Sequence, residues 1–279
     1  MSVLRVTVID VGWGDSLLLE SQDAGNNWHY ALIDCNDTST LRSSHIFLKR
    51  YFEKQNLDVP TTNPLFEWVL VTHAHSDHAL GIKRILQDYG TRRLLYSQAH
   101  GSPVFLGDLL RYAVRSDPNR VTHHESVDTG KAMPVFGDVS VRILWPRPGQ
   151  VSPHENNNSV VLALTLDKVT FVLTGDAEAE EVWSQIANQI PKSTRVFKVP
   201  HHGAENGMFT NGGLTPWLDR LGKRTRLAIS SHVRPHPHPD PQVIAELDAR
   251  HSKYYRTDLQ YHLTFETDGR RVSVRYSHV

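Results

Sequence analysis

Four side chains of types that bind metal ions lie within six positions, directly after a short apolar run. The run is Trp68–Val71, and the residues that follow it include His73, His75, Asp77 and His78. This order predicts a strand that ends in a loop rich in ligands. Neutral imidazole nitrogens and carboxylates are the groups that borderline divalent cations prefer. Four such groups at the end of one strand predict two metal ions rather than one.

The spacing within this motif assigns the ligands to two ions. His73 and His75 are two residues apart, so in an extended segment both side chains point to the same side and bind one ion together. Asp77 and His78 lie at the turn into the next segment and suit the second ion. Two ions roughly 3.5–4 Å apart would bind a hydroxide and polarise a phosphoryl or carbonyl oxygen. The motif thus predicts a hydrolase that uses metal-bound hydroxide, aligned by Asp77, and needs no serine or cysteine nucleophile.

Other predicted strands also end in potential ligands. Four of these strands show this: Asp34 follows Trp28–Ile33, Asp176 follows Val169–Leu173, the pair His201 and His202 follows Thr194–Val199, and His232 follows Leu227–Ser230. If these strand ends meet at one edge of the sheets, they build a single site whose geometry the scaffold fixes.

These residues are expected to have different roles. Asp176 would bridge the two ions. One of His201 and His202 would be a ligand and the other would contact the substrate; we assign His202 to the metal and His201 to the substrate, although the sequence leaves the reverse open. Asp34 is expected to orient a ligand histidine, and His232 to protonate a leaving group.

The hydrophobic pattern predicts an α/β fold with two central sheets and helices outside, because each half begins with strands and continues with strand–helix units. We expect helices at Thr40–Lys54, His78–Tyr89, Val104–Val114, after Asp176 through Ile186, and at Pro241–Ala249. Further strands are expected at Val3–Ile9, Ser16–Glu20, Phe66–Val71, Arg93–Tyr96, Val139–Trp145 and Val160–Leu166, and within the tail from Tyr254 to Tyr276. One domain is predicted over residues 1–279, with 147–158 as the connection between the halves.

Composition narrows the possible partners. The 279 residues include 30 Lys and Arg and 30 Asp and Glu, so no whole-protein cationic field attracts nucleic acid or acidic membranes. A polyanion site would have to be a local patch.

The single cysteine, Cys35, allows no intrachain disulfide. No stretch approaches the roughly 18 apolar residues of a membrane span, and the first residues lack the pattern of a signal peptide. A cytoplasmic protein is expected; its protein partners stay unknown.

The order His-x-His-x-Asp-His at 73–78 resembles the signature of the metallo-β-lactamase superfamily. Further segments resemble, in the same order, the ComEC-type hydrolase domains of that superfamily: Asp10–Ser16, Leu32–Asp34, Asn156–Ser159, Leu173–Asp176, Val199–Gly203, His238–Pro239 and Arg256–Asp258. The resemblance implies an αββα sandwich of two mixed sheets and a two-metal site that holds zinc or manganese. Superfamily members hydrolyse phosphodiesters, thioesters, lactones and β-lactams. The ComEC branch is associated with DNA uptake, and a related branch includes phosphocholine esterases.

The sequence departs from the family pattern at several positions. Trp13 stands where the family usually has glutamine, and Tyr261 lies near a position where glycine is common. Many members have a third histidine on the first ion before the strand at 160. Here the candidates are His154 and Asn158, and His154 is chemically the better ligand. His236 and His238, in a proline-rich loop, would either line the mouth of the site or only stiffen that loop.

The leading prediction is therefore a phosphodiesterase or nuclease with two divalent ions, zinc first and manganese second, that acts on a phosphodiester such as DNA. A lactone, thioester or β-lactam hydrolase of the same fold is the first alternative, because the fold alone does not fix the bond that is cleaved. A non-catalytic, metal-stabilised binding module is the second.

Overall fold

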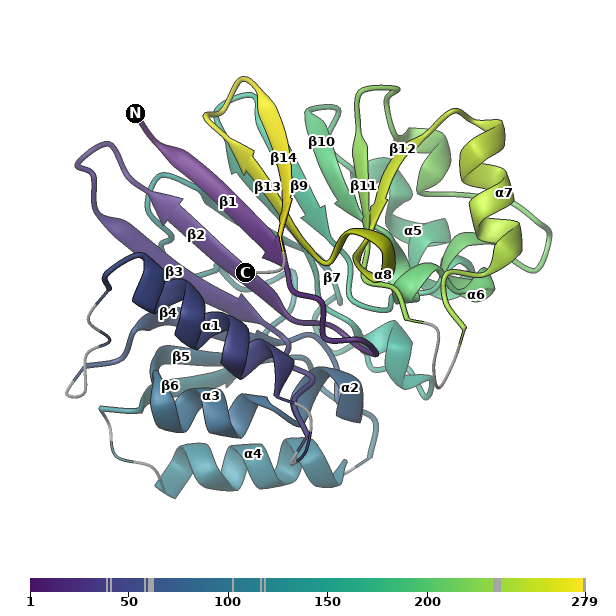
Figure 1. The fold of residues 1–279 in the computed structure, drawn as a ribbon. Helices are drawn as coiled ribbons and strands as arrows, with labels where there is room; N and C mark the ends of the chain where they lie inside the picture. The colour runs from purple at the N-terminus through teal and green to yellow at the C-terminus, as the bar shows by residue number, and fades with distance from the viewer. Residues whose placement is uncertain are drawn as a thin grey trace.

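Two β-sheets pack face to face in the computed structural model (Figure 1), which describes residues 1–38, 40, 42–57, 59, 63–101, 103–115, 117, 119–232 and 237–277. The larger sheet has eight strands in the order β14-β13-β1-β2-β3-β4-β5-β6. These are β1 (Val3–Val8), β2 (Leu17–Gln22), β3 (Trp28–Ile33), β4 (Phe66–Val71), β5 (Thr91–Tyr96), β6 (Val121–Ser126), β13 (His262–Thr267) and β14 (Val272–Ser277).

The smaller sheet has six strands in the order β12-β11-β10-β9-β8-β7. These are β7 (Ser140–Trp145), β8 (Val161–Leu166), β9 (Val169–Leu173), β10 (Thr194–Lys198), β11 (Arg226–Ile229) and β12 (Lys253–Arg256). Both sheets are mixed, since each combines antiparallel pairs with a parallel run. The αββα sandwich is thereby confirmed.

Helices cover the outer faces of both sheets (Figure 1). α1 (Ser43–Lys54), α3 (Ile82–Asp88) and α4 (Val104–Arg115) pack on the larger sheet through one apolar cluster. α7 (Pro241–Ala249) and the segments around Trp183 and Met208 pack on the smaller sheet through another. The shorter helical segments are α2 (Ser76–Ala79), η1 (Glu155–Asn158), η2 (Ala179–Trp183, a π turn), α5 (Ser184–Ile186), η3 (Ala187–Gln189), η4 (Pro200–Gly203), α6 (Glu205–Met208), η5 (Leu218–Arg220) and α8 (Thr257–Gln260).

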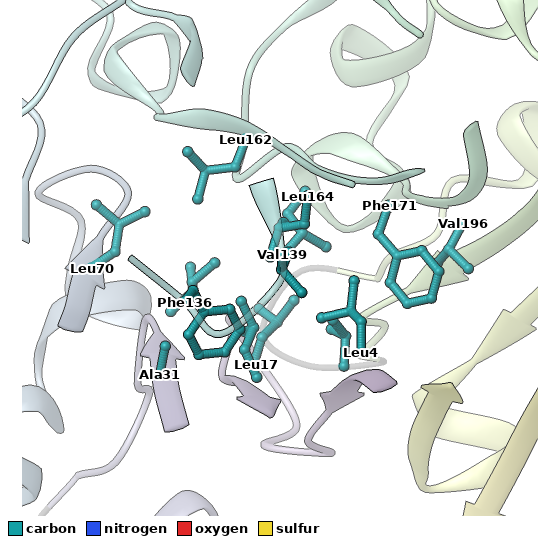
Figure 2. Close-up of a cluster of buried hydrophobic side chains, with 14 of the residues drawn as sticks. Leu4, Leu17, Ala31, Leu70, Phe136, Val139, Leu162, Leu164, Phe171 and Val196 are labelled. Carbon is teal, nitrogen blue, oxygen red and sulfur yellow. The ribbon is translucent and has the colours of Figure 1, made fainter. Parts of the chain in front are cut away.

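The third apolar cluster fills the space between the two sheets (Figure 2). On β1, Leu4, Val6 and Val8 point into it, as a period of two requires. β8 is buried on both faces: Leu162 and Leu164 belong to the cluster between the sheets, and Ala163 to the cluster under the outer helices. This explains why its sequence is an almost unbroken apolar run, as is usual for strands covered on both sides.

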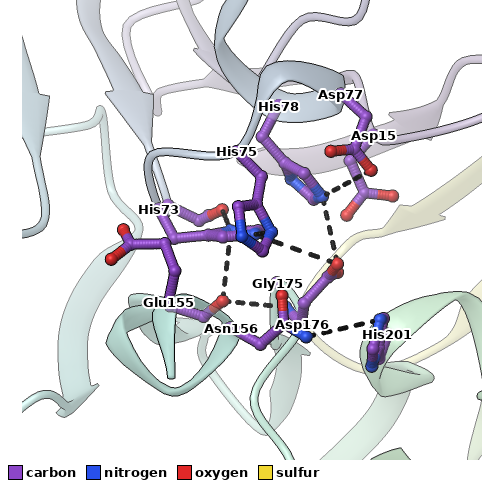
Figure 3. Close-up of polar contacts among 12 residues, drawn as sticks. Asp15, His73, His75, Asp77, His78, Glu155, Asn156, Gly175, Asp176 and His201 are labelled. Carbon is purple, nitrogen blue, oxygen red and sulfur yellow. Dashed lines mark hydrogen bonds and ion pairs between the residues drawn. The ribbon is translucent and has the colours of Figure 1, made fainter. Parts of the chain in front are cut away.

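The parallel strands place the chemistry at one edge. β3 to β6 run parallel in the larger sheet, and β9 to β12 run parallel in the smaller one. Their carboxyl ends carry Asp34, the 72–78 loop, Asp176 and the 200–203 segment, whose ligand side chains lie close together. Figure 3 shows several of these side chains, among them His73, His78 and Asp176.

Most expected elements occur with boundaries shifted by one to three residues. The expected helix His78–Tyr89 is divided into α2 and α3, and the helix expected after Asp176 is a π turn followed by short pieces. β6 was not predicted, because this edge strand carries mostly polar residues. Tyr261 has φ +61°, a backbone conformation that glycine adopts more readily. Within the described residues, no helix has the length and apolar character of a membrane span.

Candidate metal centre

Four buried side chains bring their ligand atoms within 4.8 Å of one another: Asp77, His78, Asp176 and His202. Asp176 Oδ2 lies 3.2 Å from His78 Nε2 (Figure 3). It lies 3.4 Å from His202 Nε2. Asp77 Oδ2 lies 3.6 and 3.8 Å from the same two nitrogens. Ligands that bind an ion tetrahedrally at roughly 2.0–2.1 Å are about 3.3 Å apart. The group therefore has the spacing of one metal site.

The hydrogen bonds behind the two histidines leave their Nε2 atoms available. His78 Nδ1 lies 2.7 Å from Asp34 Oδ2, and His202 Nδ1 lies 3.2 Å from the carbonyl oxygen of Ser230. A carbonyl or ionised carboxylate oxygen only accepts, so each Nδ1 carries a proton. Both Nε2 atoms, and Asp176 Oδ1, are buried without a hydrogen-bond partner among the described residues. Buried polar atoms are rarely unpaired, and these converging acceptors fit a divalent cation.

The directions of the pKa shifts indicate that this cluster favours positive charge. Burial alone would lower the pKa of His78, but the carboxylates of Asp176, Asp34 and Asp77 outweigh it and raise that pKa well above its ordinary value. Burial likewise opposes a charge on His202, yet Asp176 and Asp15 raise its pKa. Burial also opposes ionisation of Asp176, while His202 and His78 hold its pKa well below the usual range. The carboxylates that raise these histidine pKa values would attract a bound cation for the same reason, and a metal ion at Nε2 would take the place of a proton there.

His73 and His75 form a second ligand group on the other side of Asp176 (Figure 3). His73 Nε2 lies 3.1 Å from His75 Nδ1 and 3.9 Å from Asp176 Oδ2. Thr72 Oγ1 donates to Asp34 Oδ2 at 2.6 Å, so it can only accept from His73 Nδ1, which is 3.2 Å away. His73 Nδ1 therefore carries the proton, and its Nε2 lone pair faces His75 and Asp176. Asp176 lies where a ligand common to two ions would lie.

Asp34 supports both ligand groups from behind. It is fully buried at the end of β3, and its Oδ1 accepts the Thr72 N–H at 2.7 Å. Its Oδ2 holds His78 directly and His73 through Thr72. Ser159 adds a second link, since its Oγ lies 3.2 Å from His73 Nδ1 and accepts the Asp176 N–H at 2.9 Å. A conformational change at any of these residues would disturb both groups.

Asp15 and Lys198 join the cluster, although sequence reasoning did not select either. Asp15 is fully buried, with Oδ2 2.7 Å from Lys198 Nζ and Oδ1 3.6 Å from His202 Nδ1. Burial opposes its ionisation, but Lys198 and His202 lower its pKa. The available signals were an aspartate at the end of the glycine turn and a lysine just before the Pro200–Gly203 segment.

Two glycines allow the ligand loops to approach this closely. A Cβ on Gly14 would lie 2.2 Å from the backbone oxygen of Asp77, and Gly14 has φ +95°. A Cβ on Gly175 would lie 2.9 Å from the side chain of Ser159, and Gly175 has φ +52°. Any other residue would collide and strain the backbone at both positions.

His201 borders the cluster but does not join it. Its Nδ1 lies 2.9 Å from Asn206 Oδ1, and Asn206 Nδ2 donates to Glu178 Oε1 at 2.7 Å. Glu178 thus fixes the amide orientation, so His201 carries its proton on Nδ1 and its Nε2 accepts, 3.5 Å from Asn156 Nδ2. His201 and His202 have φ +50° and +55°, and this left-handed turn directs adjacent histidines to different partners. Sequence reasoning missed Glu178 and Asn206.

A cavity of about 880 Å³ opens directly over these ligands. Its lining includes His75, Asp77, Asp176, His201 and His202, and also His238, one of the two histidines expected at the mouth; His236 lies outside the described residues. Trp13 and the start of α4, Pro103 to Phe105, complete the walls. Val104 and Phe105 are 70% and 41% exposed, so they leave an apolar surface open to a ligand.

Three of the predicted or candidate residues, His154, Asn158 and His232, do not belong to the ligand group. His154 is exposed before η1 and does not belong to the cluster. The Asn158 side-chain amide accepts a hydrogen bond from the Ser152 N–H and donates to the Ser152 carbonyl and to Glu155, so these bonds occupy the groups that could bind an ion. Asn156, by contrast, lines the cavity and has a buried Oδ1 without a hydrogen-bond partner among the described residues. His232 packs near Gly12 and is not part of the described cavity lining, which does not support contact with a leaving group there.

Two mixed sheets between helices, with a buried histidine–aspartate cluster at the strand ends, define a metal-binding αββα protein. Residues 66–210 of the sequence match the family model described as the metallo-beta-lactamase superfamily. The chain therefore belongs to this superfamily.

Individual relatives are distant. The chain is 25% identical over 262 residues to ComE operon protein 3 of Bacillus subtilis (strain 168). The alignment covers 91% of this chain and 32% of that protein. It thus spans about a third of the length of that relative. Among solved structures, a long form RNase Z from yeast has a TM-score of 0.46 at 12% identity, covering 86% of this chain and 38% of that one. The metallo-β-lactamase MIM-1 from Novosphingobium pentaromativorans has a TM-score of 0.38 at 15% identity, covering 68% and 67%.

Proposed function

We propose that this chain is a hydrolase that binds two divalent ions, zinc first and manganese as the alternative, and cleaves phosphodiesters. The observation that carries the proposal is that Asp176 reaches two ligand groups that open into one cavity. Its Oδ2 is within 3.9 Å of His73 Nε2 on one side and within 3.4 Å of His78 and His202 Nε2 on the other. A pair of ions held this way suits the charge distribution of an in-line displacement at phosphorus.

When bound, such ions lower the pKa of water toward roughly 7 and stabilise charge on phosphoryl oxygens. The residues of the chain supply the positioning. The Asp77 carboxylate reaches the cavity and would accept a hydrogen bond from the attacking water, which aligns it. His201 presents Nε2 as an acceptor beside the same cavity and would take a hydrogen bond from a hydroxyl or N–H group of the substrate, while Asn206 and Glu178 hold its ring.

The walls of the cavity support a nucleic acid as the substrate. Trp13 and Phe105 offer aromatic surfaces beside the ligands, and nucleobases stack on such side chains with little regard to sequence. The resemblance to the ComEC branch, which is associated with DNA uptake, points in the same direction. We therefore propose single-stranded DNA as the first substrate to test.

The test is a side-by-side assay of metal-loaded protein on bis-p-nitrophenyl phosphate, single-stranded DNA and nitrocefin. The proposal expects hydrolysis of the first two, abolished by a chelator and by Asp77→Ala or His75→Ala. His123→Ala, at an exposed histidine of β6, serves as the matched control and should retain activity. Hydrolysis of nitrocefin alone would favour the lactam alternative, and hydrolysis of nothing would favour a binding module.

A further inference from the structure

Lys198 occupies an unusual position behind the metal centre. It is the last residue of β10 and is 1% exposed, which makes it the only fully buried lysine or arginine in the described part of the chain. Besides Asp15 at 2.7 Å, its Nζ reaches the carbonyl oxygens of Gly175 at 3.3 Å and Val199 at 3.5 Å. This one ammonium group therefore links the glycine turn that ends at Asp15 and the Gly175 turn to the end of its own strand.

The charges around Lys198 explain why a cation would be needed there. Asp15, Asp34, Asp77 and Asp176 are all buried at this end of the sandwich. Like charges held close together in a medium of low dielectric constant repel strongly. Among the described residues, Lys198 is the only lysine or arginine that lies fully buried beside them.

We infer that Lys198 is a positioning residue that supplies the positive charge the centre needs before metal binds. It neutralises Asp15, whose Oδ1 lies 3.6 Å from His202 Nδ1, and ties the Gly175 and Val199 backbone to the same point. The ligand loops therefore stay together in the metal-free protein. The inference rests on the metal centre of the proposed function, but not on the bond that is cleaved.

The experiment compares thermal unfolding of the full chain with a chelator and with excess zinc, for wild type and Lys198→Met. Without Lys198, the metal-free centre loses the one lysine or arginine side chain buried in it among the described residues, whereas the metal-loaded protein still has the ions. The rise in Tm that zinc produces should therefore be larger in the variant, by roughly 4 °C or more for a chain of this size. An equal or smaller rise would overturn the inference, because a lysine that only packs would cost both forms the same.

Two further variants keep the test decisive. Arg5→Met breaks a partly buried ion pair away from the centre and should lower Tm equally with and without zinc. The double variant Asp15→Asn, Lys198→Met removes one charge of each sign, so its zinc-induced rise should return close to that of wild type. If Lys198→Met does not fold without metal, the double variant still should, and its failure to do so would overturn the inference. A protein that shows these shifts but hydrolyses nothing would refute only the proposed function.

Discussion

Two clusters of charged side chains lie in this protein, one partly buried and one fully buried, and they differ in whether their polar atoms have hydrogen-bond partners. The first lies under α1, where Arg5 donates to Glu20, Glu266 and the Tyr51 hydroxyl at 2.8–3.1 Å. Tyr51 in turn donates to both carboxylate oxygens of Glu20 at 2.9 Å. The second is the candidate metal centre, where Asp176 Oδ1 and the Nε2 atoms of His78 and His202 have no hydrogen-bond partner within the part of the chain that the structure describes.

The difference teaches which buried charges indicate function. A closed network such as that of Arg5 offers nothing to a ligand, and its role is to join β1, β2 and α1. An open network retains a desolvation penalty that a bound ion would relieve. Buried charge alone is therefore a weak sign of a site, and buried charge with converging unpaired atoms is a stronger one.

The largest effect should come from the residue that links the two ligand groups. We expect Asp176→Asn to reduce hydrolysis to background, beyond the roughly 10–100-fold loss typical of residues behind a metal ligand, and to reduce bound metal. Assays paired with elemental analysis would measure both. Full activity with normal metal content in this variant would show that Asp176 is not shared by two ions.

Removal of metal should destabilise the second cluster and leave the first intact. Ions that bind only the folded state add about 4 kcal/mol at a free concentration of 1,000 Kd. Calorimetry with chelator and with zinc should therefore give well-separated Tm values. Coincident transitions would mean that the unpaired atoms do not hold an ion.

Arg5→Met tests the closed cluster. We expect the free energy of unfolding to fall by about 1.5–3 kcal/mol, the range for hydrogen bonds to charged groups, because Glu20 is left buried without its cation. Metal content and hydrolysis should not change. Urea denaturation measures the first quantity, and a loss of metal in this variant would contradict the separation of the two clusters.

Asn206→Ala should affect the orientation of His201 without affecting the ions. We expect kcat to fall by about 10-fold, with KM and metal content nearly unchanged, because the His201 ring loses the acceptor that fixes its tautomer. Asn211→Ala, at an exposed asparagine further along the chain, is the control. A fall in bound metal would show instead that Asn206 supports the ligands.

The smallest effect concerns Cys35, which is fully buried next to Asp34 in the chain. Burial raises the pKa of its thiol well above the ordinary value, so little thiolate forms at neutral pH. A thiol reagent such as DTNB should label the native protein very slowly and the unfolded protein fully. Rapid native labelling that zinc blocks would place Cys35 in the centre.

The sequence was informative where residues act close together along the chain. The 73–78 motif, Asp34 and Asp176 follow apolar runs, so their location at strand ends was predictable from hydrophobic pattern and from spacing. The αββα sandwich followed from the same runs together with the family resemblance. The choice of His202 rather than His201 as the residue facing the cluster depends on a left-handed backbone turn, which no pattern of apolar residues encodes.

What the sequence did not reveal depends on contacts between distant segments. Lys198 and Asp15 lie 183 positions apart in the chain and meet only because β10 and the first glycine turn converge. Glu178 and Asn206 act on His201 through hydrogen bonds whose direction needs coordinates. His154 was favoured on its chemistry alone, but the loop before η1 exposes it and turns Asn156 toward the cavity.

Metal stoichiometry is the most direct test of the central claim that the open cluster holds two ions joined by Asp176. Elemental analysis of zinc-loaded protein should find about two ions per chain in wild type and about one in each of His73→Ala and His202→Ala. The account would be contradicted by a single ion in wild type, or by two ions that persist in both variants.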